Sequence, residues 1–155
     1  MIARIITAGV VLFAASTMAQ TSSTVTRTTT LPVFGLGSTE TARVSVVNGA
    51  TTSSSGTAAS CTGSISFLNA SGAAIGSPVT FTAGSGQIVS GSLPFSSAGL
   101  SGTRGEIRAA LTLTTSTTSA APCDLQVSVS TFDTSTGATH LFAGGAEASG
   151  PFGRH

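Results

Sequence analysis

Two cysteines, far apart in the chain, each begin a stretch in which apolar and polar residues alternate. A period of two places every second side chain on the same face of a β-strand. Cys61 and Cys123 therefore share a face with apolar residues, and both are expected to point into one interior, as a cross-strand or inter-sheet disulfide requires. The residues in phase are Gly63, Ile65 and Phe67 after Cys61, and Leu125, Val127 and Val129 after Cys123.

The N-terminal residues have the order of a secretory signal peptide. The positive Arg4 precedes an apolar and small-residue run over residues 5–15, and the polar Ser16 follows it. That run is about eleven residues, whereas a membrane-spanning helix needs about 20. Thr17 and Ala19 fit the small-residue positions of a cleavage site, so we expect a signal peptide over residues 1–19. The alternative is an uncleaved N-terminal anchor.

Export places the mature chain in an oxidising compartment, secreted and either extracellular or periplasmic. Two cysteines in a small exported chain are expected to pair with each other. Closing a loop of roughly sixty residues stabilises the fold by about 4 kcal/mol in the chain-entropy model. Redox thiols are normally spaced Cys-x-x-Cys, unlike this pair.

The composition limits the partners. Charged residues make up 7% of the chain, the formal net charge is +1, and Lys, Tyr and Trp are absent. This balance gives no electrostatic footprint for nucleic acid or an anionic membrane. The platform of Trp or Tyr on which sugars stack is missing too. A protein or a cell-surface polymer is the expected partner, with no cofactor, no metal and no membrane span after signal cleavage.

The mature chain is long enough for one domain. Residues 20–40 form a Ser/Thr-rich N-terminal segment or an edge strand, residues 41–143 a β-sandwich, and residues 144–155 a flexible tail. Seven to eight short strands separated by turn signals predict an all-β fold, an immunoglobulin-like antiparallel β-sandwich with one disulfide. The expected strands are 41–48, 61–69, 73–76, 78–82, 87–93, 104–114, 123–130 and 139–143.

Four stretches carry a resemblance. They are residues 41–48, residues 61–72, residues 104–108, and residues 123–137 with the pattern Phe-Asp-x-x-Thr-Gly. Together they resemble secreted bacterial proteins of uncharacterised function and immunoglobulin-like modules of bacterial surface proteins. The resemblance implies a sandwich and export, and it supplies no catalytic residues.

The candidates for catalysis are few. His140 lies close to Asp133 across a predicted hairpin, but no Gly-x-Ser-x-Gly elbow supplies a nucleophile, so an exposed strand histidine is the simpler interpretation. Glu106 lies between Arg104 and Arg108, which favours a surface ion pair over one of two glycosidase carboxylates.

Two turn motifs have alternative interpretations. Asp133-x-Ser135-x-Gly137 resembles the start of a calcium loop, but it has one carboxylate where such loops have several, so we expect a hairpin turn. Asn69-Ala70-Ser71 matches a glycosylation acceptor and is interpreted as a turn.

The phenylalanines divide into two groups. Phe67 and Phe81 are expected in the core. Phe132, Phe142 and Phe152 are expected to form a small exposed contact patch near the C-terminal hairpin, or else to pack against the sandwich edge.

These patterns favour a non-enzymatic extracellular or cell-surface module that acts in structure or in partner binding. One alternative is a fimbrial-type subunit that assembles by strand exchange, suggested by size, export and one disulfide. The other is a hydrolase that uses His140 with an acid.

Overall fold

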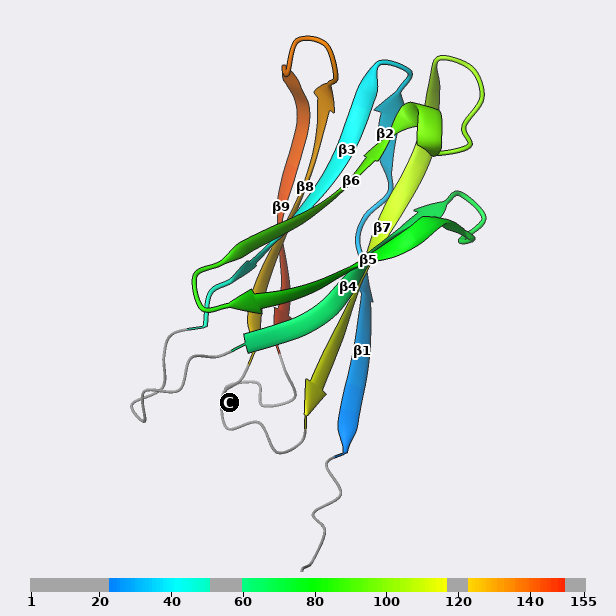
Figure 1. Cartoon of the computed structure of the whole chain (residues 1–155). Helices are drawn as coiled ribbons and strands as arrows, with labels where there is room; N and C mark the ends of the chain where they lie inside the picture. Colours follow the sequence, from blue (N-terminus) through cyan, green and yellow to red (C-terminus); the bar gives the residue numbers. More distant parts are fainter. Residues whose placement is uncertain (1–22, 51–59, 117–122, 150–155) are drawn as a thin grey trace, which may run out of the picture.

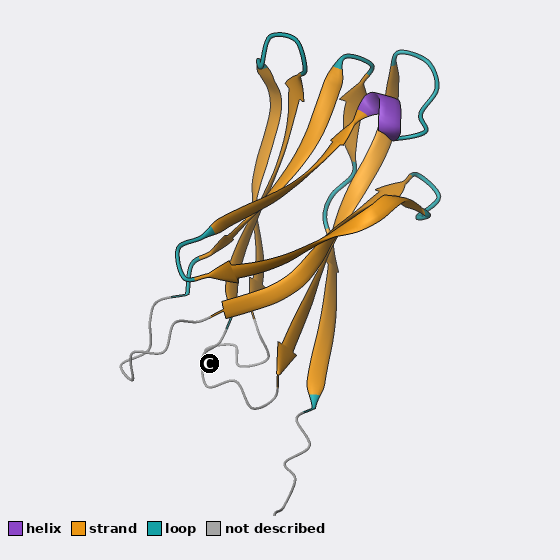
Figure 2. Ribbon diagram, in the orientation of Figure 1, coloured by secondary structure: helices purple, strands orange, loops and turns teal. Residues whose placement is uncertain are grey.

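The computed structural model describes residues 23–50, 60–116 and 123–149. These residues form nine strands and one short 3-10 helix, Phe95–Ser97, so the fold is all-β (Figures 1 and 2). The strands are β1 (Thr24–Thr30), β2 (Phe34–Gly37), β3 (Glu40–Asn48), β4 (Ser60–Asn69), β5 (Ala74–Gly84), β6 (Ile88–Pro94), β7 (Arg104–Ser116), β8 (Asp124–Asp133) and β9 (Thr139–Ser149).

The strands form two antiparallel sheets that pack as a sandwich (Figure 1). The first sheet has the order β1-β7-β4-β5, and β2 also pairs with β7. Thr30 pairs with Ala110 and Phe34 pairs with Ile107, so β1 and β2 follow one another along the same edge of β7. The second sheet has the order β6-β3-β8-β9. The predicted antiparallel sandwich is confirmed, and the described residues form nine strands where about seven to eight were expected.

The core lies between the sheets and is built from the faces that the alternation predicted. Most of its side chains come from β3, β4, β7 and β8, with further ones from β2, β5 and β6, and each is nearly or fully buried. Full burial of one such aliphatic side chain is worth about 1.5–3 kcal/mol. Phe67 and Phe81 are core residues, as expected. The strand residues in this core include Ala42, Val44, Val46, Ile65, Ile107, Leu111, Leu113, Leu125, Val127 and Val129.

The predicted disulfide joins Cys61 to Cys123, with 5.6 Å between their Cα atoms. Cys61 lies in β4 of the first sheet, and Cys123 immediately precedes β8 of the second sheet. Both residues belong to the buried core cluster. The bridge therefore ties the two sheets together through the interior at one end of the sandwich.

Two predicted boundaries are wrong. The strands expected over 73–76 and 78–82 are one strand, β5, whose pairing with β4 shifts register between Ile65 and Phe67. The flexible tail expected over residues 144–155 is wrong for residues 144–149, because β9 continues to Ser149, which pairs with Asp124. The Gly- and Ala-rich residues 144–149 of β9 show no alternation of apolar and polar side chains, but backbone pairing between strands does not require such alternation.

The N-terminal segment contains the expected edge strand, β1, and in addition β2. The expected signal peptide and residues 150–155 lie outside the described residues. In the described part of the chain, no helix has the length and apolar character needed to cross a membrane.

Strand β3 carries a buried polar residue at each end. Asn48, at its C-terminal end, is 0% exposed. Its amide nitrogen donates to the Ala83 carbonyl of β5 at 2.9 Å, and its amide oxygen accepts from the Ala50 N–H at 3.0 Å. Because β5 belongs to the first sheet, the Asn48 side chain links the two sheets at the disulfide end. Glu40 is the polar residue at the other end.

Candidate functional site

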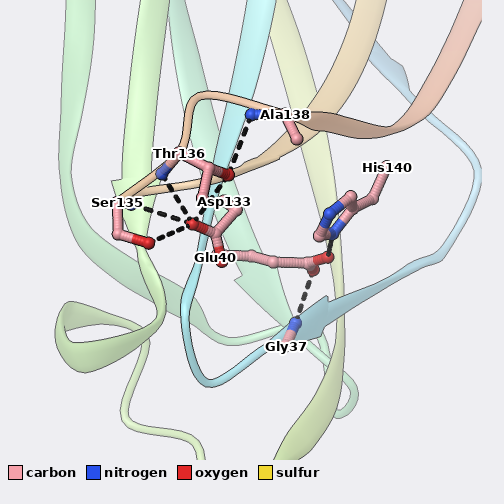
Figure 3. A network of polar contacts seen from close by, with 7 residues as sticks. All are labelled: Gly37, Glu40, Asp133, Ser135, Thr136, Ala138 and His140. Carbon is pink, nitrogen blue, oxygen red and sulfur yellow. Dashed lines mark hydrogen bonds and ion pairs between the residues drawn. The ribbon is translucent and has the colours of Figure 1, made fainter.

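Glu40 begins β3 at the end of the sandwich opposite the disulfide. Along the β3–β8 ladder, Glu40 pairs with Asp133 at this end, whereas Asn48 pairs with Leu125 at the other. Glu40 is 9% exposed. Its Oε2 accepts the Gly37 N–H of β2 at 2.7 Å, and its Oε1 is paired with Nδ1 of His140 in β9 (Figure 3). One carboxylate thus contacts both sheets.

The electrostatics favour the ionised form of Glu40. Burial opposes ionisation by desolvation, but the Gly37 N–H, the contact with His140 and the charge of Arg104 outweigh it, so the pKa of Glu40 is lowered. A carboxylate only accepts hydrogen bonds, so His140 directs an Nδ1–H at it. This orientation leaves the second ring nitrogen, Nε2, for another partner. The His140 side chain is 48% exposed and accessible.

Beside this pair, a pocket of about 490 Å³ lies between the β2 edge of the first sheet and β9 of the second sheet. We call it the rim pocket. Glu40, Arg104, Thr131 and His140 supply its polar side chains, and Gly35 also lines it. Its apolar lining is Pro32, Val33, Phe34, Val129, Leu141 and Ala143.

Arg104 reaches the rim pocket across the outer face of β2. It pairs with Gly37 on the β2–β7 ladder, and its guanidinium lies over Gly35. A Cβ at position 35 would lie 2.5 Å from Nη2 and 2.6 Å from Nε of Arg104. Glycine at position 35 therefore leaves the space in which the guanidinium lies.

The surface ion pair predicted for Glu106 is wrong. Within the described residues, no carboxylate oxygen lies within 4 Å of the Arg104 or Arg108 nitrogens. The guanidinium groups extend elsewhere: Arg104 lies over Gly35, and Arg108 reaches toward Gly72. Residues two apart on a strand share a face, but long side chains need not meet.

Asp133 is not the acid partner of His140, as a triad would have required; that partner is Glu40. Asp133 Oδ1 accepts from the backbone N–H groups of Ser135 and Thr136 and from both of their hydroxyls (Figure 3). The Ser135 hydroxyl, the Thr136 N–H and the other donors lower the pKa of Asp133 strongly. The motif is the predicted hairpin turn, with Gly137 at φ 74°.

The Asn69 sequon also forms the predicted turn. Asn69 Oδ1 accepts from the Ser71 hydroxyl at 2.7 Å and from the Ala73 N–H at 2.9 Å. These bonds close the connection between β4 and β5.

The phenylalanine patch stays a prediction. Phe132 is half-buried, and the guanidinium carbon of Arg43 lies 4.7 Å from its ring centroid, a cation–π contact. The Phe142 side chain and the whole of Phe152 lie outside the described residues. The structure therefore shows a half-buried Phe132 in contact with Arg43 and leaves the patch untested.

Known proteins give no further guide to this site. A scan against protein-family models, a search of curated proteins and a search of solved structures each found no match. In the described ranges, no three His, Cys, Asp or Glu side chains gather as a metal site would require. The fold and the site together define a disulfide-tied β-sandwich with an acid–histidine pair at the rim of a pocket.

Proposed function

We propose that this protein is a non-enzymatic binding module that acts outside the cytoplasm and takes its ligand in the rim pocket. The observation that carries the proposal is the pocket itself: an apolar wall with a few convergent polar groups is the usual composition of a ligand site. Its volume of about 490 Å³ lies within the range typical of such sites.

The proposal is tested by fragment screening with ¹H–¹⁵N NMR on the mature chain. Fragments of varied charge and size are titrated singly, and their shifts are mapped on the sequence. We expect the shifts to gather on residues of β2, β9 and the segment before β2. Shifts scattered over the sandwich, or confined to the disulfide end, would reject the rim pocket as the binding site.

Export is part of the proposal. The buried disulfide supports it, because such bridges persist in oxidising compartments. We further propose an immunoglobulin-like relationship to secreted bacterial surface modules, supported by two packed antiparallel sheets and the inter-sheet bridge. Expression of the full chain in a bacterium should give a secreted or periplasmic product that begins at Gln20 by mass spectrometry. A product that retains residues 1–19 would contradict the signal-peptide interpretation.

The rival is a hydrolase that uses His140. The Glu40–His140 pair has the form of a base oriented by an acid, but a hydrolase of this kind also needs a nucleophile beside the imidazole. Among the described residues that line the pocket, Thr131 carries the hydroxyl, and Thr131 is 1% exposed. Hydrolysis of ester or glycoside substrates by the purified protein, abolished by His140→Ala, would overturn the non-enzymatic proposal.

Strand exchange between copies is a second candidate, favoured by β1. This strand lies at the edge of the first sheet, and none of its residues is buried. It is held to β7 by backbone hydrogen bonds. A β1 strand from another copy can form the same backbone hydrogen bonds with β7. Light scattering over a range of concentrations tests it: exchange predicts oligomers that disappear when residues 20–30 are deleted, and a monomer at all concentrations contradicts it.

A further inference from the structure

We propose that the rim pocket binds a small amphipathic carboxylate, whose charged group lies between Arg104 and His140 and whose apolar part lies against the pocket wall. The inference rests on the proposed binding function and names the chemical class of the ligand. The groups that carry it come from β7 and β9, which belong to different sheets. A ligand held between them contacts both halves of the sandwich.

The Arg104 guanidinium is the first reason. It lines the pocket, and in the described part of the chain no carboxylate lies within ion-pair distance of it. A guanidinium presents a planar fork of N–H donors that matches a carboxylate with two parallel hydrogen bonds. Gly35 keeps the space over β2 open for this group.

His140 supplies a second donor or acceptor at the same pocket. Its Nδ1 is paired with Glu40, which orients the ring and leaves its Nε2 for a ligand. When the imidazole is protonated, Nε2–H adds a donor for an anionic group.

Glu40 does not oppose an anionic ligand as strongly as a free carboxylate would. Both of its oxygens are already engaged, one by the Gly37 N–H and one by His140. Although burial opposes this, the pKa of Glu40 is lowered by the Gly37 N–H and by His140, and to a smaller extent by the positive charge of Arg104. With His140 neutral, Glu40 and Arg104 balance; with His140 protonated, the site has a net positive charge.

The apolar part of the ligand has a wall to pack against. Val33 is 57% exposed and lines the pocket together with Pro32 and Leu141. Exposed apolar side chains beside convergent polar groups are typical of small-molecule sites. Packing of a hydrocarbon chain on these residues removes their apolar surface from water, which favours binding by about 25 cal/mol per Å² of surface buried.

The test uses three probes with the same hydrocarbon chain: octanoate, octanamide and octylammonium. Each is titrated into the mature chain, and Kd is measured from ¹H–¹⁵N NMR shifts. We expect octanoate to bind about tenfold more tightly than octanamide, the ratio that one charge-assisted contact of about 1.4 kcal/mol gives. Octylammonium should bind more weakly than either.

Variants locate the effect. Arg104→Gln should remove the preference for octanoate and leave octanamide binding unchanged. Gly35→Ala should weaken octanoate by a smaller factor, because a Cβ displaces the guanidinium without removing its charge. Arg43→Gln is the matched control: this arginine lies over Phe132, outside the pocket lining, and its loss should leave both affinities unchanged.

The outcomes separate the inference from the proposed function. Equal binding of octanoate and octanamide at the rim pocket, or tighter binding of octylammonium, overturns the carboxylate inference and keeps the pocket as a binding site. Equal effects of Arg104→Gln and Arg43→Gln overturn it as well. If no probe and no screened fragment binds at the rim pocket, both proposals fall.

Discussion

The two ends of strand β3 are linked to the first sheet by different kinds of buried polar side chain. At each end a buried polar side chain of the second sheet contacts the backbone of the first sheet: Asn48 bonds the Ala83 carbonyl, and Glu40 bonds the Gly37 N–H. Asn48 is neutral and lies at the end that the Cys61–Cys123 bridge closes. Glu40 is ionised and pairs with the accessible His140 (Figure 3). It also lines the rim pocket.

This difference between the two ends of β3 indicates that the disulfide end serves stability and the rim-pocket end serves binding. A neutral amide and a covalent bridge contribute stability that does not depend on the protonation of side chains. A carboxylate paired with a half-exposed histidine contributes stability that varies with pH, and the imidazole stays accessible to solvent. We therefore expect changes at the disulfide end to affect stability, and changes at the rim pocket to affect binding.

Removal of the disulfide is expected to have the largest effect. Replacement of Cys61 and Cys123 together by alanine should lower the free energy of unfolding by about 4 kcal/mol, since the unfolded chain is no longer constrained. Denaturant unfolding of the oxidised protein and the double variant measures the difference. A change below about 1 kcal/mol would show that the bridge is not a main source of stability.

Asn48→Ala should have the next largest effect, about 3 kcal/mol, because it leaves the Ala83 carbonyl and the Ala50 N–H without their partner in the interior. Asn69→Ala is the matched control, since Asn69 makes similar bonds in an exposed turn. The control should cost about 1 kcal/mol or less. Equal losses for the two variants would mean that burial of Asn48 adds nothing.

Two glycines extend the comparison to backbone packing. A Cβ at Gly63 would meet the Thr112 carbonyl and lie 2.9 Å from the Phe81 ring, so Gly63→Ala should cost about 2 kcal/mol. The atoms nearest to a Cβ at Gly35 belong to the movable end of Arg104, so Gly35→Ala should cost about 0.5 kcal/mol or less. Thermal unfolding of both variants distinguishes the sites, and a larger loss at Gly35 would contradict the assignment.

The sequence predicted the core and the bridge well, because both depend on local alternation. Ile65, Leu111 and Val127 lie on the faces that their period-two neighbours indicate. Of the site, the sequence singled out His140 but not its acid partner Glu40, because that pairing depends on strand order. Glu40 and His140 are far apart in the chain, and they meet because β3 and β9 both lie beside β8 in the second sheet.

The short distance along the chain between Asp133 and His140 suggested the wrong acid partner for His140. Asp133 is nearer to His140 along the chain, but its carboxylate is taken by the donors of its own turn. A turn signature such as Asp-x-Ser-x-Gly indicates this local use in advance. No comparable local pattern predicts the role of Arg104, because its guanidinium reaches the rim pocket over Gly35, which lies in the neighbouring strand β2.

The contrast between the ends of β3 is tested most directly by the free energy of unfolding of the wild-type protein, Glu40→Gln and Asn48→Ala at two pH values. Because the pKa of Glu40 is lowered in the folded protein, its ionisation stabilises the fold above the ordinary glutamate pKa, and this contribution is lost as pH falls through the lowered value. Solvent screening at the half-exposed His140 limits its size.

We predict that Glu40→Gln costs about 1 kcal/mol at about pH 7 and less at about pH 2, because the contribution of the ionised carboxylate falls as pH falls through its lowered pKa. The loss for Asn48→Ala should be the same at both pH values. A loss for Glu40→Gln that persists undiminished at about pH 2, or a loss for Asn48→Ala that varies with pH, would contradict the assignment of an ionic end and a neutral end.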